Sequence, residues 1–147
     1  MNFSSFAIGV VFVNFLNNKN ISDDNQEKII LHCDLNNFFA SVEIAKNPTL
    51  KDKILVVGGD IKKRKGIVLA KNEKAKEFGI KTGEPLTQAL RKCPKITCVP
   101  PNLSSYHEYS KLVKNIYLQY TDLVEPFGID ECWLDAVKKL HMKLKKE

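Results

Sequence analysis

The chain has 147 residues, which is enough for one domain or for two small domains that share an interface. Hydrophobic residues make up 44% and charged residues 27%, and this balance excludes collagen-like, low-complexity and wholly disordered chains. The 23 Lys and Arg residues outnumber the 17 Asp and Glu residues, and the resulting net charge of +6 favours a polyanionic partner, nucleic acid first.

The N-terminal part of the chain shows no membrane or export signal. Its most apolar segment, residues 6–16, is shorter than the roughly 20 residues that a membrane span needs. No Lys or Arg precedes this segment and no small-residue cleavage site follows it, so we do not expect a signal peptide. We expect residues 1–27 to be an appendage, either packed as an extra strand or poorly ordered.

The cysteines predict a reducing compartment rather than a disulfide or zinc framework. They form no Cys-x-x-Cys pair and have no His at metal-ligand spacing. We expect reduced, mostly buried thiols in a cytosolic protein at the four positions Cys33, Cys93, Cys98 and Cys132.

Hydrophobic patterning predicts a strand over residues 28–34 that ends in a carboxylate, Asp34. A helix is predicted over residues 38–46, with Asn36 and Asn37 as its capping side chains. Asp34 therefore lies at a strand-to-helix junction. Further along the chain we predict strands over residues 53–58, 67–70 and 96–99, and helices over residues 72–78 and 82–92. Gly79 is expected to end the first of these helices, and Pro85 to lie in the first turn of the second.

The second half of the chain contains the clearest helix, over residues 104–120. Ser105 and Glu108 would form a capping box at its start. Apolar residues recur at intervals of three and four and form one stripe, which consists of Tyr109, Leu112, Val113, Ile116, Tyr117 and Tyr120. We interpret this stripe as core packing in preference to base stacking. An antiparallel hairpin follows, with strands over residues 123–127 and 132–136, and residues 137–147 begin a basic amphipathic helix.

Three acidic residues stand out because apolar residues flank them: Asp34 after the first strand, and Asp130 with Glu131 at the hairpin turn. A carboxylate at the end of a buried strand costs free energy unless it is hydrogen-bonded, paired or bound to a metal. If the strands are neighbours, the acids would converge and suit Mg²⁺. Two such ions about 4 Å apart would clamp the attacking and leaving oxygens of a phosphoryl transfer. Spacing alone leaves the alternative of solvated turn residues or helix-cap partners open, and favours it.

Three segments resemble motifs of the Y-family translesion DNA polymerases, the UmuC/DinB (ImpB/MucB/SamB) group. Residues 34–43 (DLNNFFASVE) resemble the first catalytic motif, residues 66–86 the fingers segment, and residues 127–135 (FGIDECWLD) the second catalytic motif. The segments occur in the family's order. The resemblance implies an α/β (α+β) fold, in which a partial palm has an antiparallel catalytic hairpin, helices on one face and a small inserted fingers domain.

The resemblance also implies roles for residues around the three acids. Asp34 and Asp130 would bridge two Mg²⁺ ions, and Glu131 would bind the ion that activates the primer 3′-hydroxyl. The backbone carbonyl of Leu35 would add a ligand to the ion associated with the nucleotide.

A second group of residues would bind the nucleotide. Phe39 aligns with the aromatic steric gate that excludes a 2′-hydroxyl, although ordinary core packing is the alternative; of Phe38 and Phe39, one is expected to be buried and the other free for the site. Lys76 stands where the family usually has a triphosphate-contacting Arg, so it supplies charge without the bidentate fork. Glu73 replaces a common Tyr, and Asn36 replaces an acid often found there. We therefore expect weakened nucleotide binding.

The implied organisation is an N-terminal extension at residues 1–27, a partial palm at 28–46 and 104–147, and fingers at 47–103. Family members also have a thumb and a little finger, which this chain lacks, so an N-terminal fragment or truncated product is expected. The implied function is template-directed DNA synthesis past lesions, on primer–template DNA and dNTP, in the cytoplasm and without membrane contact. A sliding clamp would bind through the missing C-terminal part. The alternative is a catalytically inactive fragment that binds DNA, nucleotide or a repair partner.

The basic run at residues 62–65 has two open interpretations. It would either contact template or nucleotide phosphates from the fingers, or form a solvated surface loop.

Overall fold

The structure is a computed structural model that describes residues 8–13, 30–60 and 66–135. The basic run at 62–65 and the helix predicted from residue 137 lie outside these residues. The chain divides into two compact units. The "four-stranded unit" holds residues 8–35 together with the residues from 107 onward, and the "36–106 unit" holds the residues between them. The mixed α+β architecture predicted from the sequence is confirmed.

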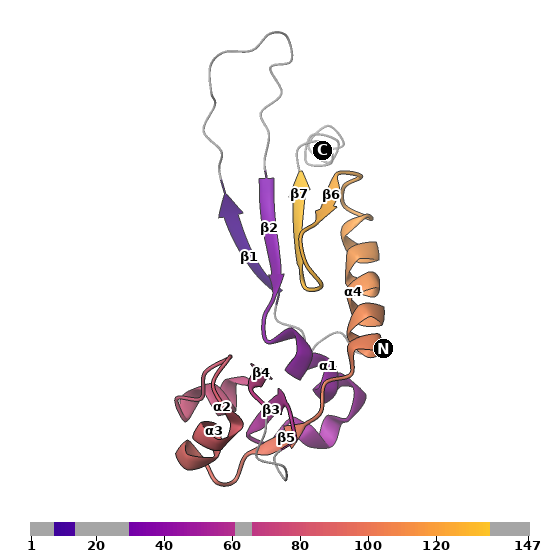
Figure 1. The fold of residues 1–147 in the computed structure, drawn as a ribbon. Coiled ribbons are helices and arrows are strands. Elements are labelled where there is room, and N and C mark those ends of the chain that lie inside the picture. The colour runs from indigo at the N-terminus through magenta and orange to yellow at the C-terminus, as the bar shows by residue number, and fades with distance from the viewer. Residues whose placement is uncertain (1–7, 14–29, 61–65, 136–147) are drawn as a thin grey trace, which may run out of the picture. The chain divides into compact units, whose positions relative to one another are not determined.

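The four-stranded unit is built on an antiparallel sheet with strand order β1-β2-β7-β6 (Figure 1). The strands are β1 (Ile8–Val13), β2 (Ile30–Leu35), β6 (Val124–Pro126) and β7 (Glu131–Asp135). Alternation along the two central strands separates two faces, as a period of two requires. One face is buried and carries Cys33, Leu35, Cys132 and Leu134. The other is partly exposed and carries His32, Asp34, Glu131 and Trp133. The acidic residues therefore belong to the more open face.

Helix α4 (Leu103–Tyr117) contributes its residues from 107 onward to this unit. Val113 and Tyr117 are buried, as the predicted apolar stripe requires. The stripe does not extend to Tyr120, which lies beyond the end of the helix and is 62% exposed. The Lys114 ammonium donates a hydrogen bond to the Gly128 carbonyl at 2.9 Å, which ties the helix to the β6–β7 hairpin.

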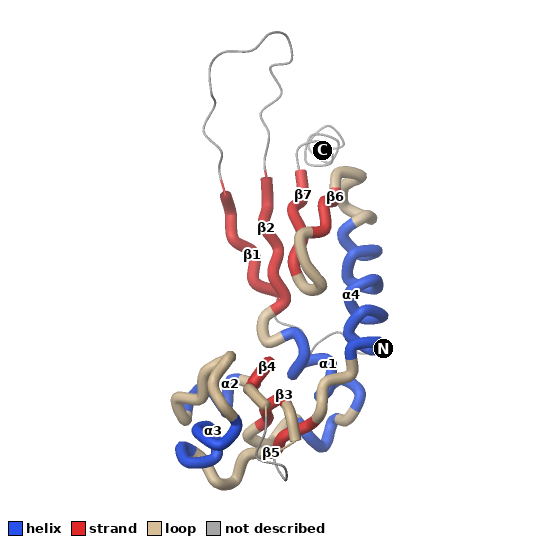
Figure 2. Tube along the Cα trace, viewed as in Figure 1, coloured by secondary structure: helices blue, strands red, loops and turns tan. Residues whose placement is uncertain are grey.

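The 36–106 unit contains a small sheet whose strands are β4, β3 and β5 in that order (Figure 2). Strand β3 pairs antiparallel with β4 and parallel with β5. Its elements are α1 (Phe38–Lys46), the 3₁₀ helix η2 (Pro48–Leu50), β3 (Leu55–Gly58), β4 (Val68–Lys71), α2 (Glu73–Glu77), α3 (Leu86–Lys92) and β5 (Thr97–Val99). Its core is the buried cluster of Val56, Val68, Ala75, Ile80, Leu86, Ala89, Cys93 and Ile96.

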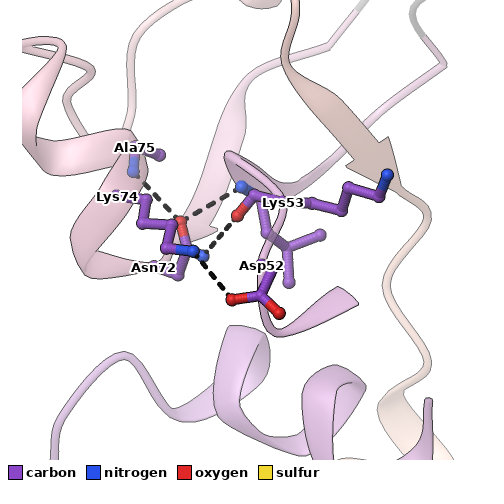
Figure 3. Close-up of polar contacts among 6 residues, drawn as sticks. Asp52, Lys53, Asn72, Lys74 and Ala75 are labelled. Carbon is purple, nitrogen blue, oxygen red and sulfur yellow. Dashed lines mark hydrogen bonds and ion pairs between the residues drawn. The ribbon is translucent and has the colours of Figure 1, made fainter. Parts of the chain in front are cut away.

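Local chemistry explains where the short helices begin and end. Asn72 caps α2 by accepting a hydrogen bond from the Ala75 N–H at 3.0 Å (Figure 3). Gly79 follows α2 with φ +71°, the left-handed conformation predicted for it. Helix α3 starts at Leu86 rather than at residue 82, because Gly83 adopts φ +83° and Pro85 is an extended N-cap. The prediction that Pro85 lies inside the first turn was therefore wrong.

The capping box predicted for the helix over residues 104–120 was also wrong. The Asn102 side chain accepts a hydrogen bond from the Ser105 N–H at 3.2 Å, so Asn102 provides the cap. The Ser105 hydroxyl instead accepts a hydrogen bond from Lys46 at 2.7 Å.

All four cysteines are free, and Cys33, Cys93 and Cys132 are buried, as predicted. Burial raises the pKa of the Cys33 and Cys132 thiols, which keeps them protonated near neutral pH. Within the described ranges, no helix has the length and apolar character that crossing a membrane demands.

Candidate functional site

Asp34 and Glu131 face each other across adjacent strands. They are direct partners in the antiparallel β2–β7 register. Such partners place their Cβ atoms about 4.5–5.5 Å apart on the same face of a sheet. The third acid is held nearby, because the Leu35 N–H donates a hydrogen bond to the Asp130 carbonyl at 3.2 Å. The structure therefore brings the three acids, 34, 130 and 131, to one corner of the four-stranded sheet.

Negative charge accumulates at this corner. Burial raises the pKa of the Asp130 carboxyl, and the neighbouring charges of Asp34 and Glu131 raise it further. Lys114 acts in the opposite direction with a smaller effect. A cation at this corner would offset the burial and the neighbouring negative charges that disfavour the ionised form of Asp130.

The residues at this corner match a hard divalent cation in donor type. Three carboxylates and a backbone carbonyl offer only oxygen ligands, which Mg²⁺ prefers. In the part of the chain that the structure describes, no group of three or more His, Cys, Asp or Glu is arranged so that it could hold a metal ion. Glu131 is directed elsewhere, since its Oε2 lies 3.6 Å from Nε2 of His32. Coordination would therefore require rotation of side chains such as Glu131, which is one-third exposed.

His32 is a neighbour of the site that sequence reasoning missed. Its ring stacks on Trp133, with centroids 4.3 Å apart and planes inclined by 20°. The signal was available, because alternation in the predicted strand over 28–34 places His32 on the same face as Asp34.

The predicted nucleotide residues all lie in the 36–106 unit. Phe38 is 2% exposed whereas Phe39 is only partly buried, in agreement with the expectation that the two rings differ. The Phe39 ring stacks on Tyr106, with centroids 4.2 Å apart and planes inclined by 11°. Tyr106 is fully buried and its hydroxyl donates to Glu43 at 2.7 Å, so the surface on which Phe39 rests is fixed.

Glu73 is bound by two groups rather than left as an isolated charge. It accepts a hydrogen bond from the Asn37 amide at 2.8 Å and lies 3.6 Å from the Lys76 ammonium. These contacts lower the pKa of Glu73, with the Asn37 hydrogen bond as the main cause. Part of the positive charge of Lys76 is thereby neutralised.

The contact with Glu73 also corrects the capping prediction for α1. Asn37 occupies the N-cap position with φ 54°, but its side chain makes no cap hydrogen bond. Asn36, the other predicted cap, is exposed, and its carbonyl accepts a hydrogen bond from the Ser41 hydroxyl at 3.2 Å.

Comparison with known proteins shows which proteins this chain resembles in sequence. Residues 33–147 match the model of the impB/mucB/samB family. DNA polymerase IV of Acetivibrio thermocellus is 54% identical over 110 residues, which cover 75% of this chain and 28% of that protein. DNA polymerase IV 1 of Bacillus subtilis is 44% identical over 110 residues, covering 75% of this chain and 27% of the relative.

Solved structures of polymerases have the same fold. A Y-family DNA polymerase chimera, Dbh-Dpo4(243-245)-Dbh, matches with a TM-score of 0.72 and 32% identity over 76% of this chain and 33% of its own. The insertion ternary complex of Dbh DNA polymerase matches with a TM-score of 0.71 and 31% identity over 80% of this chain and 35% of its own. The chain thus spans about a third or less of these relatives, and it belongs to the impB/mucB/samB family of Y-family DNA polymerases.

Proposed function

We propose that this chain carries the nucleotidyl-transfer site of a template-directed DNA polymerase that acts in translesion synthesis. The observation that carries the proposal is the pairing of Asp34 with Glu131, together with the backbone bond that places Asp130 beside Leu35. The names of the relatives, DNA polymerase IV, supply the reaction class. The proposed substrates are primer–template DNA and a dNTP, in the cytoplasm.

In this proposal Asp34 and Asp130 would each contribute to the binding of two Mg²⁺ ions. Glu131 would be a further ligand of the ion next to the primer, and the Leu35 carbonyl would be a further ligand of the ion next to the nucleotide. When bound, the ions would favour the ionised primer 3′-hydroxyl and neutralise charge on the phosphates. The chain's own acids perform no covalent chemistry. They position the reacting groups, and positioning with charge neutralisation dominates phosphoryl transfer.

The 36–106 unit would hold the nucleotide. Phe39, supported from behind by the buried Tyr106, would act as the steric gate that excludes a 2′-hydroxyl from the sugar site. Lys76 would contact the triphosphate, with its charge reduced by Glu73. Replacement of Phe39 by Ala would therefore relax the preference for dNTP over rNTP, and replacement of the buried Phe38 would instead destabilise the unit.

A second candidate function is DNA or nucleotide binding without catalysis. The Glu73–Lys76 ion pair favours it, because a carboxylate beside the candidate phosphate contact opposes an anionic ligand. Duplex affinity is a sum of many phosphate contacts, so a chain that matches a third of its relatives would grip DNA weakly. Any sliding clamp would contact parts of the longer relatives that these residues do not match.

The test has to distinguish weak DNA binding by the free chain from a candidate site that cannot catalyse nucleotidyl transfer. Residues 33–147 replace the matching segment of the Acetivibrio thermocellus polymerase, and the chimera is assayed for Mg²⁺-dependent primer extension beside the free 147-residue chain. We expect the chimera to extend primers, and Asp130→Asn or Glu131→Gln to abolish extension. Glu125→Gln, an exposed acid on β6, is the matched control and should leave extension unchanged. A chimera that binds DNA and does not extend it would support the second candidate.

A further inference from the structure

Gly9 interrupts a strand whose other residues strongly favour strands. The sequence of β1 is IGVVFV, and a glycine inside such a strand weakens it, since it has no side chain to pack. Glycine in a strand interior typically marks a bulge, a tight bend or a place that a ligand approaches closely. The six residues of β1 pair with β2 in continuous register, Ile8 with Leu35 through Val13 with Ile30, so no bulge explains Gly9.

The register places Gly9 directly opposite Asp34. Asp34 in turn lies opposite Glu131, so positions 9, 34 and 131 form one row across β1, β2 and β7. Residues in such a row share a face of the sheet, and opposed Cβ atoms lie about 5 Å apart. A side chain introduced at position 9 would therefore point to the same face of the sheet as Asp34 and Glu131.

We propose that Gly9 is a positioning residue that keeps the space beside Asp34 open for the water shell of a bound Mg²⁺ ion. This inference rests on the function proposed above. Mg²⁺ retains several of its waters when one or two carboxylates bind it, and these waters need room next to the carboxylate. Position 9 lies outside residues 33–147, so the N-terminal strand adds to the site something that the family match does not include.

The decisive variant is Gly9→Val, tested for Mn²⁺ binding to the 147-residue protein by electron paramagnetic resonance of the free ion. We expect affinity to fall about tenfold, the size of effect typical for groups around a metal's first ligands. The melting temperature without metal should stay the same or rise, because Val favours strands. A glycine with a purely structural role would give the opposite result, namely lost stability with unchanged affinity of the folded protein.

Three controls separate this inference from the proposed function. Val10→Ile enlarges the neighbouring residue, which is paired with Cys33, and should leave affinity unchanged. In an Asp34→Asn background, Gly9→Val should cause no further loss. If Asp34→Asn alone leaves Mn²⁺ binding intact, the ion site of the proposed function fails.

If binding depends on Asp34 and Gly9→Val binds as tightly as the unaltered chain, only the role of Gly9 is overturned. Should Gly9→Val not fold, Gly9→Ala decides the question, and an unchanged affinity in that variant overturns the inference.

Discussion

Asn72 and Leu55 are joined by two hydrogen bonds in opposite directions. The Leu55 N–H donates to the Asn72 side-chain oxygen at 3.1 Å, and the Asn72 N–H donates to the Leu55 carbonyl at 3.0 Å. The Asn72 amide also donates to the Lys53 carbonyl at 2.9 Å (Figure 3). One buried side chain thus connects the start of β3 with the start of α2.

Replacement of Asn72 by Ala should destabilise the 36–106 unit by about 2–4 kcal/mol. The change removes partners from the Leu55 and Ala75 N–H groups and from the Lys53 carbonyl, and buried groups without partners are costly. Urea unfolding followed by circular dichroism measures the effect. Asn102→Ala removes an exposed helix cap and should cost about 1 kcal/mol. Equal losses in the two variants would show that the buried network adds nothing beyond a cap.

Local patterns were sufficient for the elements that carry the candidate site. Helix α1 has the predicted bounds, residues 38–46, because Asn47-Pro48 stops it. Asp34 lies in β2, one residue before the end of the strand and four before that helix, close to the strand end predicted from the apolar run. The antiparallel hairpin followed from the short turn between two apolar runs. Such features depend on residues close in sequence, and so they can be predicted from it.

The contacts that were missed join residues far apart in sequence. The Asn37 side chain donates a hydrogen bond to Glu73, 36 positions away, instead of capping α1. The residues near Asn37 in the sequence do not predict this contact. The pairing of Gly9 with Asp34 depends on which strand takes the edge position beside β2, which composition does not determine. In both cases tertiary structure overrides a local preference.

Glu84 and Lys92 should make stability depend on pH. Desolvation raises the pKa of the buried Glu84, but hydrogen bonds from Lys92 and the Lys81 backbone outweigh it, so the pKa lies below its usual value. A lowered pKa stabilises the fold above the unfolded-state value of about 4.3, and the contribution is lost as the pH falls through the folded-state pKa.

Glu84→Gln should therefore cost about 1–2 kcal/mol at pH 7, the range for a buried group that loses its partner. The difference from the unaltered chain should shrink as the pH falls below the unfolded-state pKa of about 4.3 and through the lower pKa of Glu84 in the folded protein. Urea unfolding at several pH values measures both. A difference that is independent of pH would contradict an ionised Glu84 in the folded protein.

Glu73→Gln should strengthen binding of a nucleoside triphosphate. The change removes a carboxylate beside Lys76 while the Asn37 hydrogen bond can persist to the Gln oxygen. Because both side chains are exposed, we expect only about a two- to fivefold gain in affinity, measured with a fluorescent dNTP analogue. Glu77→Gln, an exposed acid on the same helix, controls for net charge. An equal gain in both variants would mean that Lys76 is not a specific phosphate contact.

Asp130→Asn should stabilise the protein when no metal is present. Burial together with Asp34 and Glu131 raises the pKa of Asp130 above its unfolded-state value, so its ionised form opposes folding. That penalty grows as the pH rises through the unfolded-state pKa and then through the higher folded-state pKa. Removal of the charge should raise the melting temperature by about 2–4 °C, which corresponds to about 1 kcal/mol in a chain of this size.

Millimolar Mg²⁺ should then stabilise the unaltered chain and not the variant, because the variant lacks a ligand. Asp122→Asn, at an exposed position, should change neither value. A lower melting temperature for Asp130→Asn without metal would show that the carboxylate stabilises the fold. It would contradict the prediction that the ionised Asp130 destabilises the protein in the absence of a cation.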